Sequence, residues 1–242
     1  MSFWSYVNSV VFLLYSYLII FILLKNPKAL INRVCAAALA CHALWSFGYI
    51  FIFNSNVSKE ITKLIMHITS IGWIFFASFT LWFAILAAEN KKILEKKIIY
   101  LFIFLPPIFL IFKQWTNFLV VDFTEEVYGW SAVWSRTIWP FIFYTYYLAY
   151  TSAGLYLMLD FRERSSEPTK KSLGMTLFVT TIIPLIFGTL TDLLLPELNI
   201  NKVPSVANIM SLLWGFGLLY LLKRYKFMTP AYLSGWSVLK YS

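Results

Sequence analysis

Charged side chains are scarce in this chain. Only 13% of its 242 residues are Asp, Glu, Lys or Arg, against 60% hydrophobic residues, and the mean hydropathy is +0.72. A soluble domain carries about 25% charged residues and needs no such excess of apolar side chains. The composition therefore excludes an ordinary soluble domain and favours a protein embedded in a membrane.

Cysteine and the motifs of familiar membrane enzymes are also rare or missing. The two cysteines, Cys35 and Cys41, lie in one apolar run, where we expect small packing residues rather than a disulfide. The sequence contains no HExxH motif, no paired intramembrane aspartates, no Gly-rich phosphate loop and no nucleophile elbow. We therefore expect no catalytic residue, no metal site and no cofactor.

Seven apolar runs follow one another between polar breaks. A bilayer core about 30 Å thick asks for about 20 apolar residues per helical pass, and continuous runs lack the alternation of a membrane barrel. The first run has neither the basic start nor the cleavage site of a signal peptide, so we expect it to remain as a helix. The sequence predicts an all-α bundle of seven transmembrane helices, at about residues 3–24, 34–53, 64–88, 98–112, 137–159, 172–195 and 203–222.

The basic residues indicate the orientation of the bundle, because cytoplasmic loops retain an excess of Lys and Arg. With the N-terminus outside, fifteen of the 20 basic residues fall in cytoplasmic segments, and the outer segments hold Lys59, Lys63, Lys113, Arg136 and Lys202. We expect an outer N-terminus, a cytoplasmic C-terminus and a location in the cell membrane. Anionic lipid on the inner leaflet then accounts for the net charge of +9, and no nucleic-acid partner is needed.

The sequence lacks the residues that bind retinal or haem in membrane helix bundles. A retinal Schiff base needs a lysine within the last helix, and the last run contains none between Lys202 and Lys223. A haem held by two histidines needs both at one depth. His42 is mid-membrane and His67 is near the outer end of the next run, roughly 10 Å away along the membrane normal. We expect neither retinal nor haem.

One polar break, residues 113–136, is long and rich in aromatic side chains, which surround Asp122, Glu125 and Glu126. A structureless loop seldom holds so many aromatic residues. We therefore expect a small lid over the outer end of the bundle, built as a hairpin through about 118–123 and 127–134. An aromatic belt lying flat on the lipid headgroups is the alternative.

Asp192 is the only carboxylate inside an apolar run, close to the outer end of the sixth, and Thr189 lies on the same helical face. The Asp192 side chain would pair with Arg136, reach the headgroups or contact a ligand. Pairing or exposure at the interface is the more usual role of such a residue.

Other polar and aromatic residues could share this site. Asn208 belongs to a stripe of small and polar residues in the last run, a pattern more typical of helix packing than of ligand binding. Aromatic residues in the outer half could line a cavity below the loop, although they more often serve packing. Our candidates for ligand binding are Asp192, Thr189, Asn208, Arg136, Trp139, His67 and Tyr144, with Trp73 and Tyr147 as further cavity residues.

The last third of the chain has a distinctive pattern, in which Pro184, Gly188, Asp192, Pro196 and Pro204 precede a helix with the basic exit 223–227. This pattern resembles the N-terminal seven-transmembrane region of bacterial and archaeal sensor histidine kinases. The earlier runs agree in layout, with the long outer loop before the fifth run and with Trp45, Trp82, Pro106 and Pro107.

The resemblance implies a membrane sensory module, which we expect at residues 1–222. Our leading hypothesis is that it detects an extracellular or lipid-borne small molecule, or a membrane property. A connector, residues 223–242, would pass the signal to a cytoplasmic output module such as a histidine kinase, with Pro184, Tyr225 and Pro230 in the relay. Any kinase activity would lie beyond Ser242 or in a partner, and a homodimer stays open.

Two other functions stay open beside a sensory domain. A small seven-helix transporter would show a repeat of three helices about the fourth. Sugar transporters of that kind carry Pro-Gln dipeptides, whereas the only glutamine here, Gln114, follows Lys113. A membrane enzyme acting on lipid would need catalytic groups that converge at one depth. A sensory domain is our leading hypothesis.

Overall fold

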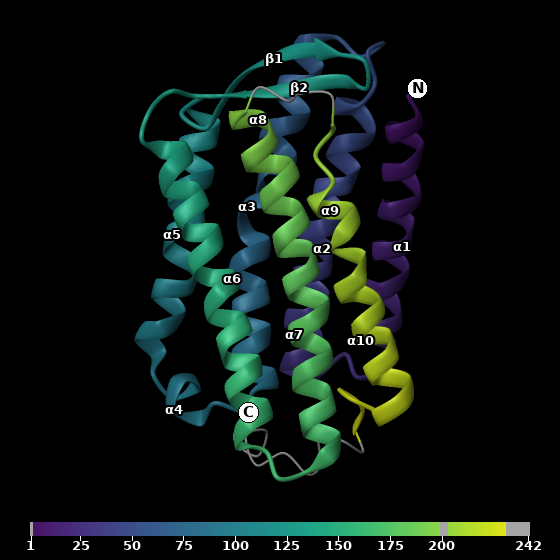
Figure 1. Ribbon diagram of the computed structural model, residues 1–242, viewed down its shortest axis with the longest axis vertical. Coiled ribbons are helices and arrows are strands. Elements are labelled where there is room, and N and C mark those ends of the chain that lie inside the picture. The colour runs from purple at the N-terminus through teal and green to yellow at the C-terminus, as the bar shows by residue number, and fades with distance from the viewer. Residues whose placement is uncertain (1, 199–202, 231–242) are drawn as a thin grey trace.

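The computed structural model describes residues 2–198 and 203–230, which form a bundle of long helices capped at one end by a hairpin (Figure 1). The long helices are α1 (Phe3–Lys25), α2 (Leu30–Ile52), α3 (Lys59–Ala87), α5 (Lys97–Trp115), α6 (Trp139–Arg164), α7 (Pro168–Thr189) and α10 (Leu212–Tyr225). Shorter elements are α4 (Lys91–Leu94), a π-helical turn η1 (Leu190–Leu194), α8 (Leu195–Glu197) and α9 (Ala207–Met210).

Five helices are long and apolar enough to cross a membrane: α1, α2, α3, α5 and α7 continued through η1. Helices α6 and α9–α10 lie beside them in the same bundle, and α9 is separated from α10 by a break at Ser211. The protein is therefore a multi-pass membrane protein, as the apolar runs predict.

Burial separates the central helices from the peripheral ones. In the apolar windows of α2 and α3, 61% and 67% of the residues are buried, against 28% in α1 and in α5. Helix α1 turns one stripe inward, including Tyr15 and Ile22, while Leu13 and Leu24 remain exposed on its other side. Exposed large apolar side chains of this kind are stable only against lipid, so the outer surface of the bundle agrees with a membrane location.

The predicted hairpin is confirmed. Strands β1 (Val120–Glu126) and β2 (Gly129–Trp134) pair antiparallel, with Glu126 opposite Gly129, and lie across one end of the bundle (Figure 1). Gly129 has a φ of 123°, and a Cβ there would lie 2.5 Å from the Phe53 backbone at the end of α2. Only glycine fits both requirements, so this residue seats the tip of the hairpin on the bundle.

The last helix begins later than predicted. Residues 203–206 are not helical, and α9 starts at Ala207. The N–H group of Val206 donates to Thr191 Oγ1 at 3.4 Å, so the segment before α9 turns toward η1 instead of extending the helix. At its other end α10 runs to Tyr225, past the expected end at 222.

A buried polar node joins helices that are far apart in sequence. The Asn208 amide donates to Asn8 Oδ1 at 2.7 Å and to Ser46 Oγ at 2.9 Å, and the Tyr15 hydroxyl donates to the Asn208 carbonyl at 2.7 Å. All four residues are buried. In an apolar surrounding such bonds fix which helix faces meet, so Asn208 holds α9 against α1 and α2.

The close packing of α2 and α3 depends on Gly72, where a Cβ would lie 2.5 Å from the Cys41 carbonyl oxygen. At Gly154 of α6 a Cβ would meet Ala84 at an ordinary 3.6 Å. Both positions are helical, so alanine brings the same gain in helix propensity at each.

We predict that Gly72→Ala destabilises the protein by about 1–3 kcal/mol through overpacking, whereas Gly154→Ala leaves its stability unchanged or raises it. Thermal unfolding of both variants in one detergent measures this. Equal melting temperatures for the two variants would contradict the packing described.

Candidate functional site

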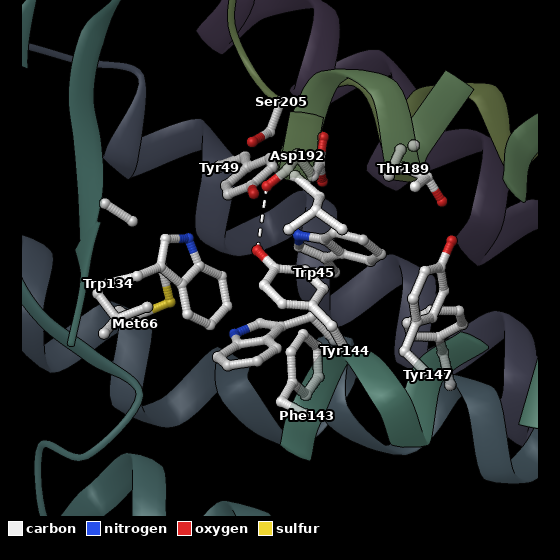
Figure 2. Close-up of a pocket in the computed structure, with 17 residues that line it drawn as sticks. Trp45, Tyr49, Met66, Trp134, Phe143, Tyr144, Tyr147, Thr189, Asp192 and Ser205 are labelled. Atoms are coloured by element: carbon white, nitrogen blue, oxygen red, sulfur yellow. Dashed lines mark hydrogen bonds between the residues drawn. The ribbon is translucent and has the colours of Figure 1, made fainter. Parts of the chain in front are cut away.

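A cavity, here called the outer cavity, lies at the hairpin end of the bundle, against strands β1 and β2 (Figure 2). Its volume, counted as the space open to the centres of water-sized molecules, is about 80 Å³. One water needs roughly 10–15 Å³ on the same measure. Helices α2, α3, α6 and α7, both strands and the segment before α9 contribute to its wall. Its aromatic side chains are Trp45, Tyr49, Trp73, Phe76, Trp134, Phe143, Tyr144 and Tyr147.

Asp192 lies in this wall, on the π-helical turn η1, and is partly buried. Thr191 Oγ1 donates to Asp192 Oδ1 at 2.7 Å, and the Tyr144 hydroxyl donates to the Asp192 carbonyl at 3.1 Å. The Ser205 hydroxyl and the N–H groups that begin the last helical segment also face the carboxylate. Single π turns within α-helices are frequent at functional sites, because they redirect one side chain out of register.

Among the described residues, every hydrogen-bond partner of the Asp192 carboxylate is neutral. No Lys, Arg or His lines the described part of the cavity. Arg136 is exposed, and no ion pair joins it to Asp192, so the expected pairing of these two residues is wrong. The physical reason is that Arg136 follows the hairpin toward solvent, while the π turn directs Asp192 inward. The cavity therefore presents one negative charge in an aromatic surrounding.

The structure brings several predicted residues together in the cavity wall, namely Asp192, Thr189, Tyr144, Trp73 and Tyr147. Figure 2 shows the Thr189 and Tyr147 hydroxyls facing each other.

Four other candidates lie outside this wall. The His67 carbonyl accepts a hydrogen bond from Trp115 Nε1 at 2.9 Å, and Lys113 Nζ lies 4.3 Å from the centre of the Trp139 ring. Asn208 belongs to the polar node between helices, and Arg136 is exposed.

Sequence reasoning missed five of the eight aromatic residues of the wall. These five line the cavity without having been proposed for it, and so does Ser205; they are Trp45, Tyr49, Phe76, Trp134 and Phe143. The sequence offered one signal for them: a lid implies a covered space, and Trp134 lies at the end of the expected lid. The other wall residues could be assigned only with knowledge of which helix faces meet.

A smaller cavity of about 40 Å³ adjoins the first on the side away from the hairpin. Trp45, Phe76 and Tyr147 line both cavities and so lie between them. His42 and Pro184 line the inner cavity. Three aromatic side chains therefore separate the cavity under the hairpin from a second cavity that reaches Pro184 of α7.

Ion pairs and hydrogen bonds hold the hairpin over the outer cavity. Asp122 of β1 accepts a hydrogen bond from Lys59 Nζ at 2.8 Å and forms an ion pair with Lys63 Nζ at 2.9 Å, both on α3. Trp130 Nε1 donates to the Val57 carbonyl at 2.9 Å. The bonds from Lys59 and Lys63 hold the pKa of Asp122 well below its ordinary value. The attachment is therefore present above the ordinary carboxyl pKa, near 4, and is lost only as the pH falls toward the depressed value.

Comparison with known proteins gives one match. The model of a family described as the N-terminal 7TM region of histidine kinase matches residues 7–227, which is nearly the whole chain. A search of the curated proteins found no match, and a search of the solved structures found none either.

We predict that Asp122→Asn speeds amide hydrogen exchange in β1 and β2 by a few-fold at most, because ion pairs this exposed are screened by solvent. After correction for the intrinsic exchange rate, the difference from the wild-type protein should stay constant between about pH 5 and pH 8. Glu125→Gln is the matched control, since Glu125 is exposed on the same strand and takes part in no ion pair among the described residues. Equal exchange in both variants would show that Asp122 does not hold the hairpin down.

Proposed function

The chain belongs to the family of N-terminal 7TM regions of histidine kinases, and from this premise we propose that it is a sensory domain with its ligand site in the outer cavity. Occupation of the cavity would be relayed through α7 and α10 to a cytoplasmic output module of the full protein. The observation that carries the proposal is the cavity itself, which is covered by a hairpin and contains a carboxylate that no cation of its described wall neutralises.

The proposal includes seven membrane crossings in the cell membrane, with the N-terminus outside. Helix α6, of 26 residues, and the broken pair α9–α10 would join the five strongly apolar helices. The distribution of Lys and Arg supports this orientation, because fifteen of the 20 then lie in cytoplasmic segments. The hairpin and the cavity would consequently face the outside.

Helix α7 is the element best placed to carry a signal. Its outer end continues into η1 with Asp192, Pro184 interrupts its hydrogen bonding at the inner cavity, and its inner end bears Ser172. Ser172 Oγ lies 2.9 Å from the hydroxyl oxygen of Tyr225, at the end of α10. A Cβ at Gly217 of α10 would lie 2.7 Å from Thr180, so these two helices pack closely enough to move together.

The exit from α10 is tied to the core. After Tyr225 the chain reverses through Lys226 and Met228, which have φ values of 53° and 61°. Phe227 between them is fully buried, with its ring centre 6.3 Å from that of Phe83. The start of the proposed connector thus packs into the bundle, and Pro230 follows directly. A small change in the packing of α7 against α10 would alter this contact, which supports a relay through the segment.

We predict that Asp192→Asn and Tyr225→Phe each change autophosphorylation of the full-length kinase in membranes while changing its melting temperature little. Asparagine keeps the size of aspartate, and phenylalanine removes only the hydroxyl that meets Ser172. If one pathway joins the two residues, the effects of the double variant will not add.

Tyr156→Phe is the matched control, because the Tyr156 side chain is 68% exposed on α6 and should leave output unchanged. Wild-type output in Asp192→Asn would refute control of output by the cavity. Strictly additive effects of the two changes would refute the relay.

A further inference from the structure

We propose that the ligand of the outer cavity carries a small organic cation, a quaternary or protonated ammonium group. This inference depends on the proposed function, in that it names the chemical class of the ligand for that same site. Three properties of the cavity point to this class: the sign of its charge, its aromatic wall and its donor set.

The charge is the first property. Among the described residues of the cavity wall, Asp192 is the only acidic one and none is basic. The groups that face its carboxylate, among them the Thr191 and Ser205 hydroxyls, are neutral, so they orient the carboxylate without cancelling its charge. In a surrounding of low dielectric constant an unpaired carboxylate attracts a cation strongly and repels an anion.

The aromatic wall is the second property. Figure 2 shows the rings of Tyr49, Trp134 and Tyr144 around the space beside Asp192. The rings pack against one another in pairs, because the ring centres of Trp134 and Tyr144 are 5.2 Å apart and those of Trp45 and Tyr49 are 6.1 Å apart. The faces of aromatic rings carry negative potential, and cages of such rings recognise alkylammonium groups.

The donor set argues against a metal ion as the bound cation. Calcium and magnesium need six or more oxygen ligands, with several carboxylates among them. The described residues contain no cluster of three His, Cys, Asp or Glu side chains suited to a metal, and the wall offers a single carboxylate. An organic cation needs no such coordination, since rings and one carboxylate satisfy it. The cavity volume of about 80 Å³ is large enough for a group of a few heavy atoms.

The alkylammonium group could come from a free molecule or from the headgroup of a lipid, and the test separates these sources. The full chain is placed in nanodiscs of phosphatidylglycerol, which has no ammonium group. Tetramethylammonium, choline and ethanolammonium are titrated by calorimetry, beside 3,3-dimethylbutan-1-ol, the uncharged isostere of choline. A repeat in nanodiscs with phosphatidylcholine shows whether a lipid headgroup occupies the site, because it would then weaken choline binding.

We expect at least one of the cations to bind, and choline to bind at least tenfold more tightly than its uncharged isostere. Asp192→Asn should abolish this preference, and Trp134→Leu should weaken cation binding. Glu60→Gln is the control, since it removes a carboxylate from an exposed position at the same end of the bundle, outside the cavity wall, and should change nothing.

Two results would overturn the inference: binding of none of the three cations, or binding of the neutral isostere as tightly as choline. Either leaves the sensory role standing, because that role is tested by the output of the full-length kinase. Conversely, cation binding without any effect of Asp192→Asn on output would refute the sensory role and leave the ligand class intact.

Discussion

A carboxylate enclosed by aromatic rings in a membrane protein is costly, and the hairpin end of this bundle is arranged around Asp192. The π turn directs the side chain inward, Thr191 donates to it, and the non-helical start of the last segment brings neutral polar groups toward it. These dipoles lower the free-energy cost of burying the carboxylate but do not neutralise its charge. A protein that needed only stability would replace such a group by an apolar one, so a charge kept there favours a functional role.

The same constraint connects the hairpin above the site to the helices below it. The hairpin, attached to α3 through Lys59 and Lys63, covers the cavity at one end of the bundle. Helix α7 continues into η1, which bears Asp192, at that end and meets α10 through Ser172 and Tyr225 at the other. A bound ligand can shift such an assembly only by preferring one of two packings, and Pro184, which donates no backbone hydrogen bond, is the position in α7 where such a shift would be least costly.

Much of this architecture could be predicted from sequence. Lipid requires long apolar runs, and the aromatic residues in one polar break indicate the hairpin. The positions of α1, α2, α3 and α5 and the hairpin followed from these patterns. The π turn could not be predicted, since its residues fit an ordinary helix equally well. The convergence of Trp45 with Trp134 and the burial of Phe227 depend on which faces of distant helices meet, and helical periodicity does not specify that. Asn208, a ligand candidate whose stripe is more typical of helix packing, lies in a polar node between helices.

The proposal that the cavity is negative and faces the outside can be tested most directly at Ser205, which lies in its wall beside Asp192. Intact cells carrying the Ser205→Cys variant would be treated with two membrane-impermeant thiol reagents of similar size, one cationic and one anionic. Each rate is divided by the rate of the same reagent with a free thiol. We predict modification from outside, with the cationic reagent favoured and the preference lost when Asp192→Asn is added. Equal corrected rates, or modification only from the cytoplasmic side, would contradict the account.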